Sequence, residues 1–200
     1  RKEDKRAYPN RLELGWRHGV SVPNGLNSGA AGGLLFDRTL MPYYDLKNFD
    51  DLPIPFRCVA TEITSGKKHV FEDGSLAQAM RATMSIPGMF APVQHGNEIY
   101  SDGAAVDNLP VDVARAMGAD VVIAVYLDTG PVNPATLTSP LAVAGRNVSI
   151  MVAANEQASM KNADVLLKAD VSKFSATDFG KSEDIIPQGL KAAEVHAAVL

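Results

Sequence analysis

The sequence LPVDVARAMGADVVIAVY, residues 109–126, carries the clearest signal of fold class. It predicts a helix that begins near Leu109–Pro110, since proline is tolerated in a first helical turn, with Asn108 as its cap. Gly118 follows the last helical residue, where glycine adopts a left-handed helix end at little cost. The apolar run Val121–Tyr126 then predicts a central strand buried on both faces. A helix, a tight glycine turn and an apolar strand form one αβ unit of a parallel sheet with right-handed crossovers.

Regular elements are also predicted in the residues before this unit. Phe56–Ile63 is rich in β-forming residues and poor in charges, which predicts another strand buried on both faces, as parallel sheets require. Lys68–Phe71 predicts a further strand after a turn. Ser75 is placed to cap a helix over Leu76–Ser85, and Glu98–Ser101 predicts a short strand.

Further strands and helices are predicted toward the two ends of the chain. We predict a strand at Leu12–Trp16, a turn at Pro23–Gly25, a helix that begins in Gly29–Gly33, a long helix over Leu141–Lys161, a strand over Asp164–Ala169 and a last helix from Ser182. A phosphate-binding loop remains a remote alternative for Gly29–Gly33, although no Gly-Lys-Ser/Thr ending follows it. The predicted fold is α/β: a three-layer α/β/α sandwich with a mostly parallel central sheet, forming one domain over residues 1–200.

Composition narrows the range of functions. The 200 residues carry a net charge of −4, so no clustered basic face for nucleic acid is expected. The four histidines form no closely spaced pair, and we predict neither a metal site nor a cofactor. Cys58 is the only cysteine, and its apolar neighbours predict a buried, inert thiol rather than a nucleophile.

Three segments carry the functional signal. They are FDDLPIPFRCVAT at 49–61, GSLAQAMRATMSIPGMFAPV at 74–93 and SDGAAVDNLP at 101–110. In their order and spacing they resemble the bacterial patatin-like phospholipase family, and the resemblance continues more weakly to the end of the chain. Taken alone, Asp102-Gly103 would indicate no more than a common turn.

The resemblance implies a serine hydrolase without a catalytic histidine. Members of the family use a Ser-Asp dyad to cleave acyl esters of phospholipids or lysophospholipids, so peripheral membrane contact is expected. The family's aspartate matches Asp102, and Gly103 and Ala104 complete the Asp-Gly-Ala form of its motif. An acyl-chain pocket walled by Met84, Ile86, Met89 and Phe90 is one interpretation of these apolar residues; a plain core is the other.

The family's nucleophile motif is missing from the sequence. No Gly-x-Ser-x-Gly occurs, and Gly25-Leu26-Asn27-Ser28-Gly29 has its serine one place too late. We therefore expect the serine to lie upstream of Arg1, so that this chain is the C-terminal portion of the family's domain, without its N-terminal part, and is inactive alone.

Two other classes of function stay open. One is a catalytically silent lipid-binding or scaffold domain of the same fold, which an upstream region lacking the serine would indicate. The other is a generic nucleotide-binding α/β domain, which would require a glycine fingerprint between a strand and a helix.

Overall fold

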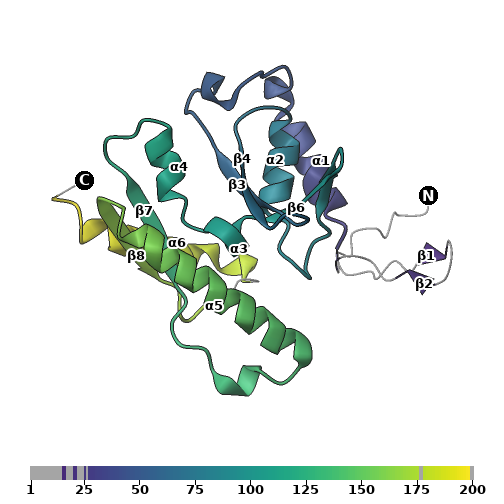
Figure 1. Ribbon diagram of the computed structural model, residues 1–200. Coiled ribbons are helices and arrows are strands. Elements are labelled where there is room, and N and C mark those ends of the chain that lie inside the picture. The colour runs from purple at the N-terminus through teal and green to yellow at the C-terminus, as the bar shows by residue number, and fades with distance from the viewer. Residues whose placement is uncertain (1–14, 17–19, 22–24, 26, 176–177, 199–200) are drawn as a thin grey trace, which may run out of the picture. The chain divides into compact units, whose positions relative to one another are not determined.

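The computed structural model describes residues 15–16, 20–21, 25, 27–175 and 178–198 (Figure 1). The chain divides into two compact units, Arg1–Val106 and Asp107–Leu200. Among the helices in these described ranges, none is both long and apolar enough to cross a membrane.

The first unit is built on a four-stranded sheet in the order β4-β3-β6-β5. Its strands are β3 (Cys58–Glu62), β4 (Lys67–Phe71), β5 (Val93–His95) and β6 (Glu98–Asp102). The three strands predicted in this region are confirmed, and all five residues of β3 are buried. The parallel pairing predicted for Phe56–Ile63 is wrong, because β3 runs antiparallel to both β4 and β6. Turns of a few residues join β3 to β4 and β5 to β6, and such short connections allow only antiparallel neighbours.

Two helices and two short 3-10 turns accompany this sheet. They are α1 (Ala30–Thr39), η1 (Met41–Tyr43), η2 (Phe49–Asp51) and α2 (Leu76–Thr83). The Ser75 hydroxyl accepts a hydrogen bond from the backbone N–H of Gln78 at 3.3 Å, so the predicted cap is confirmed. Phe49, Cys58, Leu76 and Ala79 form a buried apolar cluster between the loop, the sheet and α2.

The remaining predictions for the first unit concern its N-terminal end. A short antiparallel pair, β1 (Gly15–Trp16) and β2 (Val20–Ser21), covers only the end of the strand predicted at Leu12–Trp16. The other residues of that strand lie outside the described ranges, as does most of the turn predicted at Pro23–Gly25. The helix predicted from Gly29–Gly33 is confirmed as α1, whose cap Gly29 has the left-handed φ of 71°.

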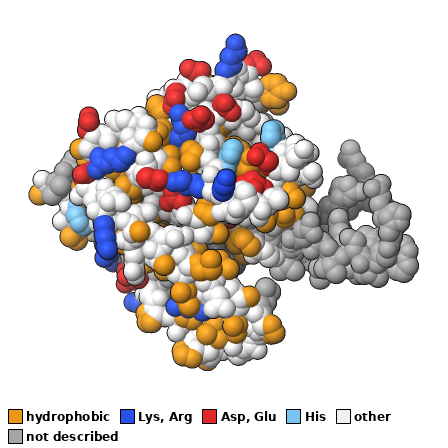
Figure 2. All heavy atoms as spheres, in the orientation of Figure 1, with side chains coloured by type: hydrophobic (Ala, Val, Ile, Leu, Met, Phe, Trp, Pro, Cys, Tyr) orange, Lys and Arg blue, Asp and Glu red, His pale blue; other side chains and the backbone are white. Residues whose placement is uncertain are grey.

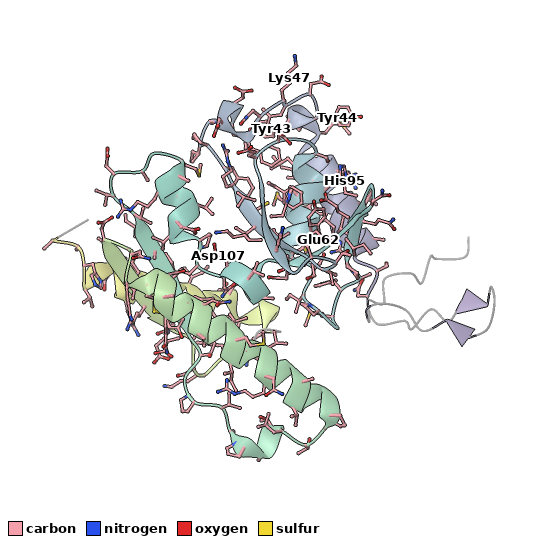
Figure 3. All side chains as sticks on the ribbon, in the orientation of Figure 1. Tyr43, Tyr44, Lys47, Glu62, His95 and Asp107 are labelled. Atoms are coloured by element: carbon pink, nitrogen blue, oxygen red, sulfur yellow. The ribbon has the colours of Figure 1, made fainter. Side chains whose placement is uncertain are left out.

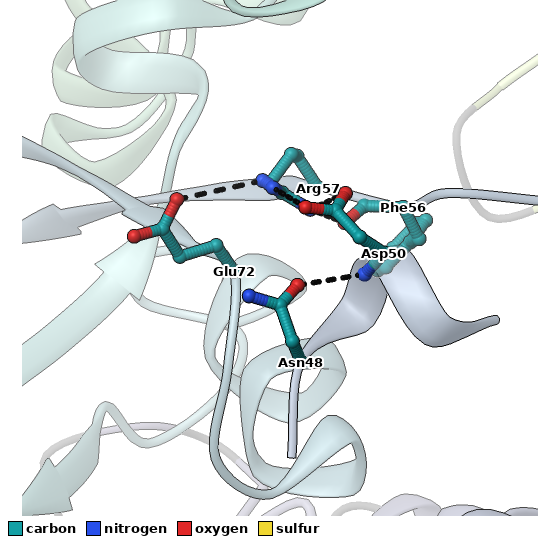
Figure 4. Close-up of polar contacts among 5 residues, drawn as sticks. All are labelled: Asn48, Asp50, Phe56, Arg57 and Glu72. Carbon is teal, nitrogen blue, oxygen red and sulfur yellow. Dashed lines mark hydrogen bonds and ion pairs between the residues drawn. The ribbon is translucent and has the colours of Figure 1, made fainter. Parts of the chain in front are cut away.

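An arginine at the start of β3 ties the neighbouring loop to the sheet (Figure 4). Two nitrogens of the Arg57 guanidinium lie 2.8 Å from the two carboxylate oxygens of Asp50, and a third lies 3.7 Å from Glu72. Asn48 caps η2 by accepting a hydrogen bond from the N–H of Asp50 at 2.8 Å. The paired guanidinium holds the pKa of Asp50 below its ordinary value.

The second unit contains the parallel pair of strands. β7 (Ile123–Asp128) pairs with β8 (Val165–Asp170) in parallel, with Ile123 opposite Val165. Around it stand α4 (Val111–Ala116), η3 (Pro134–Thr136), α5 (Pro140–Met160), η4 (Phe179–Lys181) and α6 (Ser182–Glu194). The αβ unit predicted from residues 109–126 is therefore confirmed, including Gly118, whose φ is 90°.

Two details of that unit were predicted wrongly. Val122 and Ala124 are buried, whereas Ile123, Val125 and Leu127 are 49%, 55% and 58% exposed, so one face of β7 lacks a cover among the described residues. An apolar run does not reveal whether one face or both are covered.

The predicted helix cap is also wrong. The cap of α4 is Pro110 rather than Asn108. The side-chain amide of Asn108 donates instead to the carboxylate of Glu156 on α5.

The long helix α5 presents apolar side chains to the surface (Figure 2). The exposed fraction lies between 41% and 60% for four of its residues, Val143, Val148, Ile150 and Met151. The α/β fold class is confirmed, with one correction: among the strands that the structure describes, β7 and β8 pair in parallel, whereas the larger sheet is antiparallel.

Candidate active site

Asp102 is the last residue of β6, where the chain passes into the short helix α3 (Ala104–Asp107). Three hydrogen bonds fix it. Its N–H donates to the carbonyl of Ser85 at 3.0 Å, and its own carbonyl accepts from the Thr61 hydroxyl at 2.8 Å. Its side-chain oxygen Oδ1 accepts from the N–H of Ala104 at 2.8 Å. The carboxylate therefore occupies one defined position at the end of a strand.

Close packing, rather than an unusual backbone angle, requires a glycine at position 103. Gly103 is absent from the glycines with positive φ. A Cβ at this position would lie 2.3 Å from the carbonyl oxygen of Val59, on the neighbouring strand β3. That oxygen also accepts a hydrogen bond from the Thr83 hydroxyl at 2.5 Å, which leaves it little room to move. Asp102-Gly103 thus joins a strand to a helix with the chain pressed against β3, unlike a hairpin turn.

Burial changes the acidity of Asp102. The side chain is partly buried, and desolvation raises the pKa of Asp102 above its ordinary value, although the Ala104 hydrogen bond opposes the shift. A carboxylate with a raised pKa is a stronger base. The site thus holds a positioned carboxylate whose basicity is increased by its surroundings.

Cys58, the only cysteine in the sequence, is inert as a nucleophile in this environment. Cys58 is buried in β3, and desolvation raises the pKa of its thiol to about 12. At neutral pH the sulfur is therefore a thiol, and the sequence-based prediction for this residue is confirmed.

Comparison with known proteins adds to this geometry. The model of the family described as patatin-like phospholipase matches residues 5–115, more than half of the chain. The chain belongs to the patatin-like phospholipase family. That match includes Asp102, Gly103 and Ala104 and all of the four-stranded sheet.

Individual relatives show how far the similarity extends. Patatin-like phospholipase domain-containing protein 7 of the mouse is 28% identical over 186 residues, 78% of this chain and 14% of its own length. An uncharacterised NTE family protein of Mycobacterium tuberculosis is 35% identical over 114 residues, 56% of this chain and 32% of that protein. Human patatin-like phospholipase domain-containing protein 6 is 37% identical over 95 residues, 46% of this chain and 7% of that protein. The chain spans less than a third of each of these relatives.

The four apolar residues predicted to wall an acyl pocket follow one another between α2 and β5. Met84, Met89 and Phe90 are partly buried, and Ile86 is 44% exposed. The N–H groups of Met89 and Phe90 both donate to the Ile86 carbonyl at 3.0 Å, which closes this segment into a tight turn. The Phe90 ring is covered by the guanidinium of Arg81, whose Cζ lies 5.5 Å from the ring centroid. Their role as an acyl-chain surface stays a prediction.

Several polar residues that hold this patatin-like site were missed from the sequence. Backbone carbonyls near Asp102 accept hydrogen bonds from the side chains of Thr61, Thr83, Arg81 and Ser85. One signal was available for Arg81, which is a charged residue in the otherwise uncharged helix sequence LAQAMRAT. The two threonines and the serine carry no such signal, since these residue types lie mostly on protein surfaces.

Proposed function

We propose that this chain is part of a serine acyl hydrolase in which Asp102 is the general base of a Ser-Asp dyad. The observation that carries the proposal is Asp102 at a strand end, where two hydrogen bonds hold its backbone, one from the N–H of Ala104 holds its carboxylate, and burial makes the carboxylate more basic. Membership of the patatin-like phospholipase family supports a lipid as the substrate. The nucleophilic serine is assigned to a part of the protein outside these 200 residues, because none of them forms a Gly-x-Ser-x-Gly motif.

The division of labour between the two carboxylate oxygens follows from the geometry. Oδ1 of Asp102 accepts the N–H of Ala104, so we assign Oδ2 to the serine hydroxyl. As the serine oxygen attacks the acyl carbonyl carbon, its proton passes to Oδ2. When the tetrahedral intermediate collapses, the bond between the acyl carbon and the leaving alcohol breaks. The oxygen of the leaving alcohol then takes the proton from Oδ2 of Asp102. Water then attacks the acyl-serine by the same route, which releases the fatty acid and restores both groups.

The substrate that fits this proposal is a phospholipid or a lysophospholipid. Such a molecule lies in a membrane or a micelle, so the protein must contact a lipid surface to reach the ester bond. Met84, Ile86, Met89 and Phe90 are proposed to receive the acyl chain, because they are apolar and the turn that carries them is hydrogen-bonded, through Ser85, to the backbone of Asp102.

The proposal can be tested with an activity-based probe on the full-length protein. A fluorophosphonate reacts only with an activated serine, so mass spectrometry of the labelled protein identifies the nucleophile. We expect one labelled serine within a Gly-x-Ser-x-Gly sequence, and release of fatty acid from phospholipid or lysophospholipid vesicles. The proposal would be refuted by a full-length protein that neither reacts with the probe nor hydrolyses these lipids but still binds the vesicles. That result would establish a catalytically silent lipid-binding domain.

A further inference from the structure

The guanidinium of Arg81 is buried in α2, with the residue 9% exposed. In the part of the chain that the structure describes, three oxygens accept hydrogen bonds from it, and none is a carboxylate. They are the carbonyls of Ser28 and Ala91, both at 2.9 Å, and the hydroxyl of Ser85 at 2.6 Å. A buried charge is tolerated when protein groups replace the hydrogen bonds it made to water. Here those groups belong to two separate segments, the chain at Ser28 and the loop that contains Ser85 and Ala91, which Arg81 therefore holds together.

The two segments lie side by side. The N–H of Asn27 donates to the Met89 carbonyl and the N–H of Ala91 donates to the Asn27 carbonyl, both at 2.9 Å. Gly29 completes the enclosure, because a Cβ there would lie 2.1 Å from a guanidinium nitrogen of Arg81. The packing leaves room for the arginine only where residue 29 lacks a side chain.

The third contact leads to the candidate base. Ser85 is fully buried, and its hydroxyl accepts from the Arg81 guanidinium and donates to the Arg81 carbonyl at 2.8 Å. The Ser85 carbonyl in turn accepts the N–H of Asp102 at 3.0 Å. The hydrogen-bonded connection from the guanidinium to the backbone of Asp102 therefore passes through one residue.

We propose that Arg81 is a positioning residue for Asp102, acting through Ser85. The proposal rests on the function proposed above for Asp102. Arg81 fixes the turn that carries the Ser85 carbonyl, and this carbonyl fixes the end of β6 from which the carboxylate projects. The planar guanidinium holds its N–H donors in a fixed arrangement that can reach three acceptors at once. A lysine ammonium on a flexible chain cannot reproduce this arrangement. Small displacements of a catalytic group lower the rate strongly, by about 100-fold for 1 Å.

Kinetics of the full-length protein give the first measurement. Arg81→Ala should lower kcat by about tenfold to 100-fold, as expected for a displaced catalytic group, and leave KM for a short-chain ester unchanged. Loosening the site admits water to Asp102 and returns its pKa toward the ordinary value, so the acidic limb of the pH–rate profile should move to lower pH. Arg81→Lys should recover part of kcat, and millimolar guanidinium should restore activity to Arg81→Ala.

Amide hydrogen exchange gives a second measurement that does not depend on activity. In Arg81→Ala the Asp102 N–H should exchange faster, since its acceptor is no longer held, while amides in the centre of β3 keep their protection. Ser85→Ala should produce a weaker form of the same change, because it removes the hydroxyl and keeps the carbonyl. If Arg81→Ala does not fold, the same comparison is made with Arg81→Lys and Ser85→Ala.

Arg115→Ala is the control, since Arg115 also donates to two carbonyls, those of Ala119 and Asp120, but pairs with the carboxylate of Asp164 and belongs to the second unit. It should change neither kcat nor the exchange of the Asp102 amide. The Arg81 variants could instead keep the kcat, the pH profile and the Asp102 amide exchange of the wild type, while Asp102→Asn is inactive. That result would overturn the role proposed for Arg81 and leave the proposed function standing. An active Asp102→Asn would instead overturn the proposed function, whatever the exchange data show.

Discussion

Asp102 and Asp170 end strands in the two units of the molecule and form the same local turn. Asp102 closes β6 and accepts the N–H of Ala104 at 2.8 Å; Asp170 closes β8 and accepts the N–H of Ser172 at 3.0 Å. Their pKa values nevertheless shift in opposite directions. Burial raises the pKa of Asp102, whereas hydrogen bonds from Ser172 lower the pKa of the exposed Asp170. The turn is a common structural device, and desolvation is what makes one of the two carboxylates suitable as a base.

The first test of this comparison replaces each of the two aspartates by asparagine in a separate variant. In the full-length protein Asp102→Asn should lower kcat/KM for a short-chain ester by about 10² to 10⁴, the usual contribution of general-base catalysis. Asparagine keeps the oxygen that accepts the Ala104 N–H, so the turn should survive and circular dichroism should match the wild type. Asp170→Asn should leave the rate unchanged. Equal activity of the two variants would remove Asp102 from the mechanism.

The second test concerns the packing that brings the chain against β3. Gly103→Ala places a methyl group into the Val59 carbonyl, so it should lower the free energy of unfolding by about 1 to 3 kcal/mol. Gly189 is the contrasting case, since it lies inside α6 and a Cβ there meets no atom within 4 Å. Gly189→Ala should stabilise the protein by about 0.5 to 1 kcal/mol. Urea titration measures both, and destabilisation by Gly189→Ala would contradict this view of the helix.

A third test compares a covered strand with an exposed one. Val59 in β3 is buried and Val125 in β7 is 55% exposed. Val59→Thr buries a hydroxyl beside Gly103 and should cost about 1 to 3 kcal/mol of unfolding free energy. Val125→Thr should change it by less than about 0.5 kcal/mol, as at other surface positions. A large loss of stability in Val125→Thr would show that this face of β7 is covered in solution.

The fourth test uses the acid side of the stability profile. Glu62 at the end of β3 (Figure 3) accepts the N–H groups of Ser65 and Thr64 at 2.7 and 3.0 Å, and these two residues lower the pKa of Glu62 to about 2. A lowered pKa stabilises the folded state above the unfolded pKa, and the gain disappears as the pH falls through the folded value. The Tm difference between wild type and Glu62→Gln should therefore be constant above about pH 5 and vanish toward pH 2. A difference that grows on acidification would contradict the assignment.

The sequence was sufficient for much of the fold and for proposing Asp102 as the candidate base, a role that stays a prediction. Val121–Tyr126 and Asp164–Ala169 were predicted as strands and Ser75 as the cap of α2, because periodicity and caps act over a few neighbouring residues. Pairing direction depends on residues distant in sequence, so Phe56–Ile63 was placed in a parallel sheet that is in fact antiparallel.

The surroundings of the site were beyond sequence reasoning. Gly103 was interpreted as a turn glycine, whereas its packing against the Val59 carbonyl requires knowledge of which strand lies beside β6. The link from Arg81 through Ser85 to Asp102 joins α2 to the end of β6, and a single sequence contains no record of such a contact. The candidate base could be proposed from its motif, but the groups that hold it could not.

The central claim, that burial makes Asp102 a base, is tested most directly by titrating side-chain carboxyl groups. Carbon-13 NMR of aspartate-labelled protein, with Asp102→Asn and Asp170→Asn used to assign the two signals, follows each carboxyl as the pH changes. The structure predicts that Asp102 titrates above about 3.9, the ordinary value for aspartate, and that Asp170 titrates below it. An Asp102 signal that titrates together with Asp170, at or below that value, would contradict the claim.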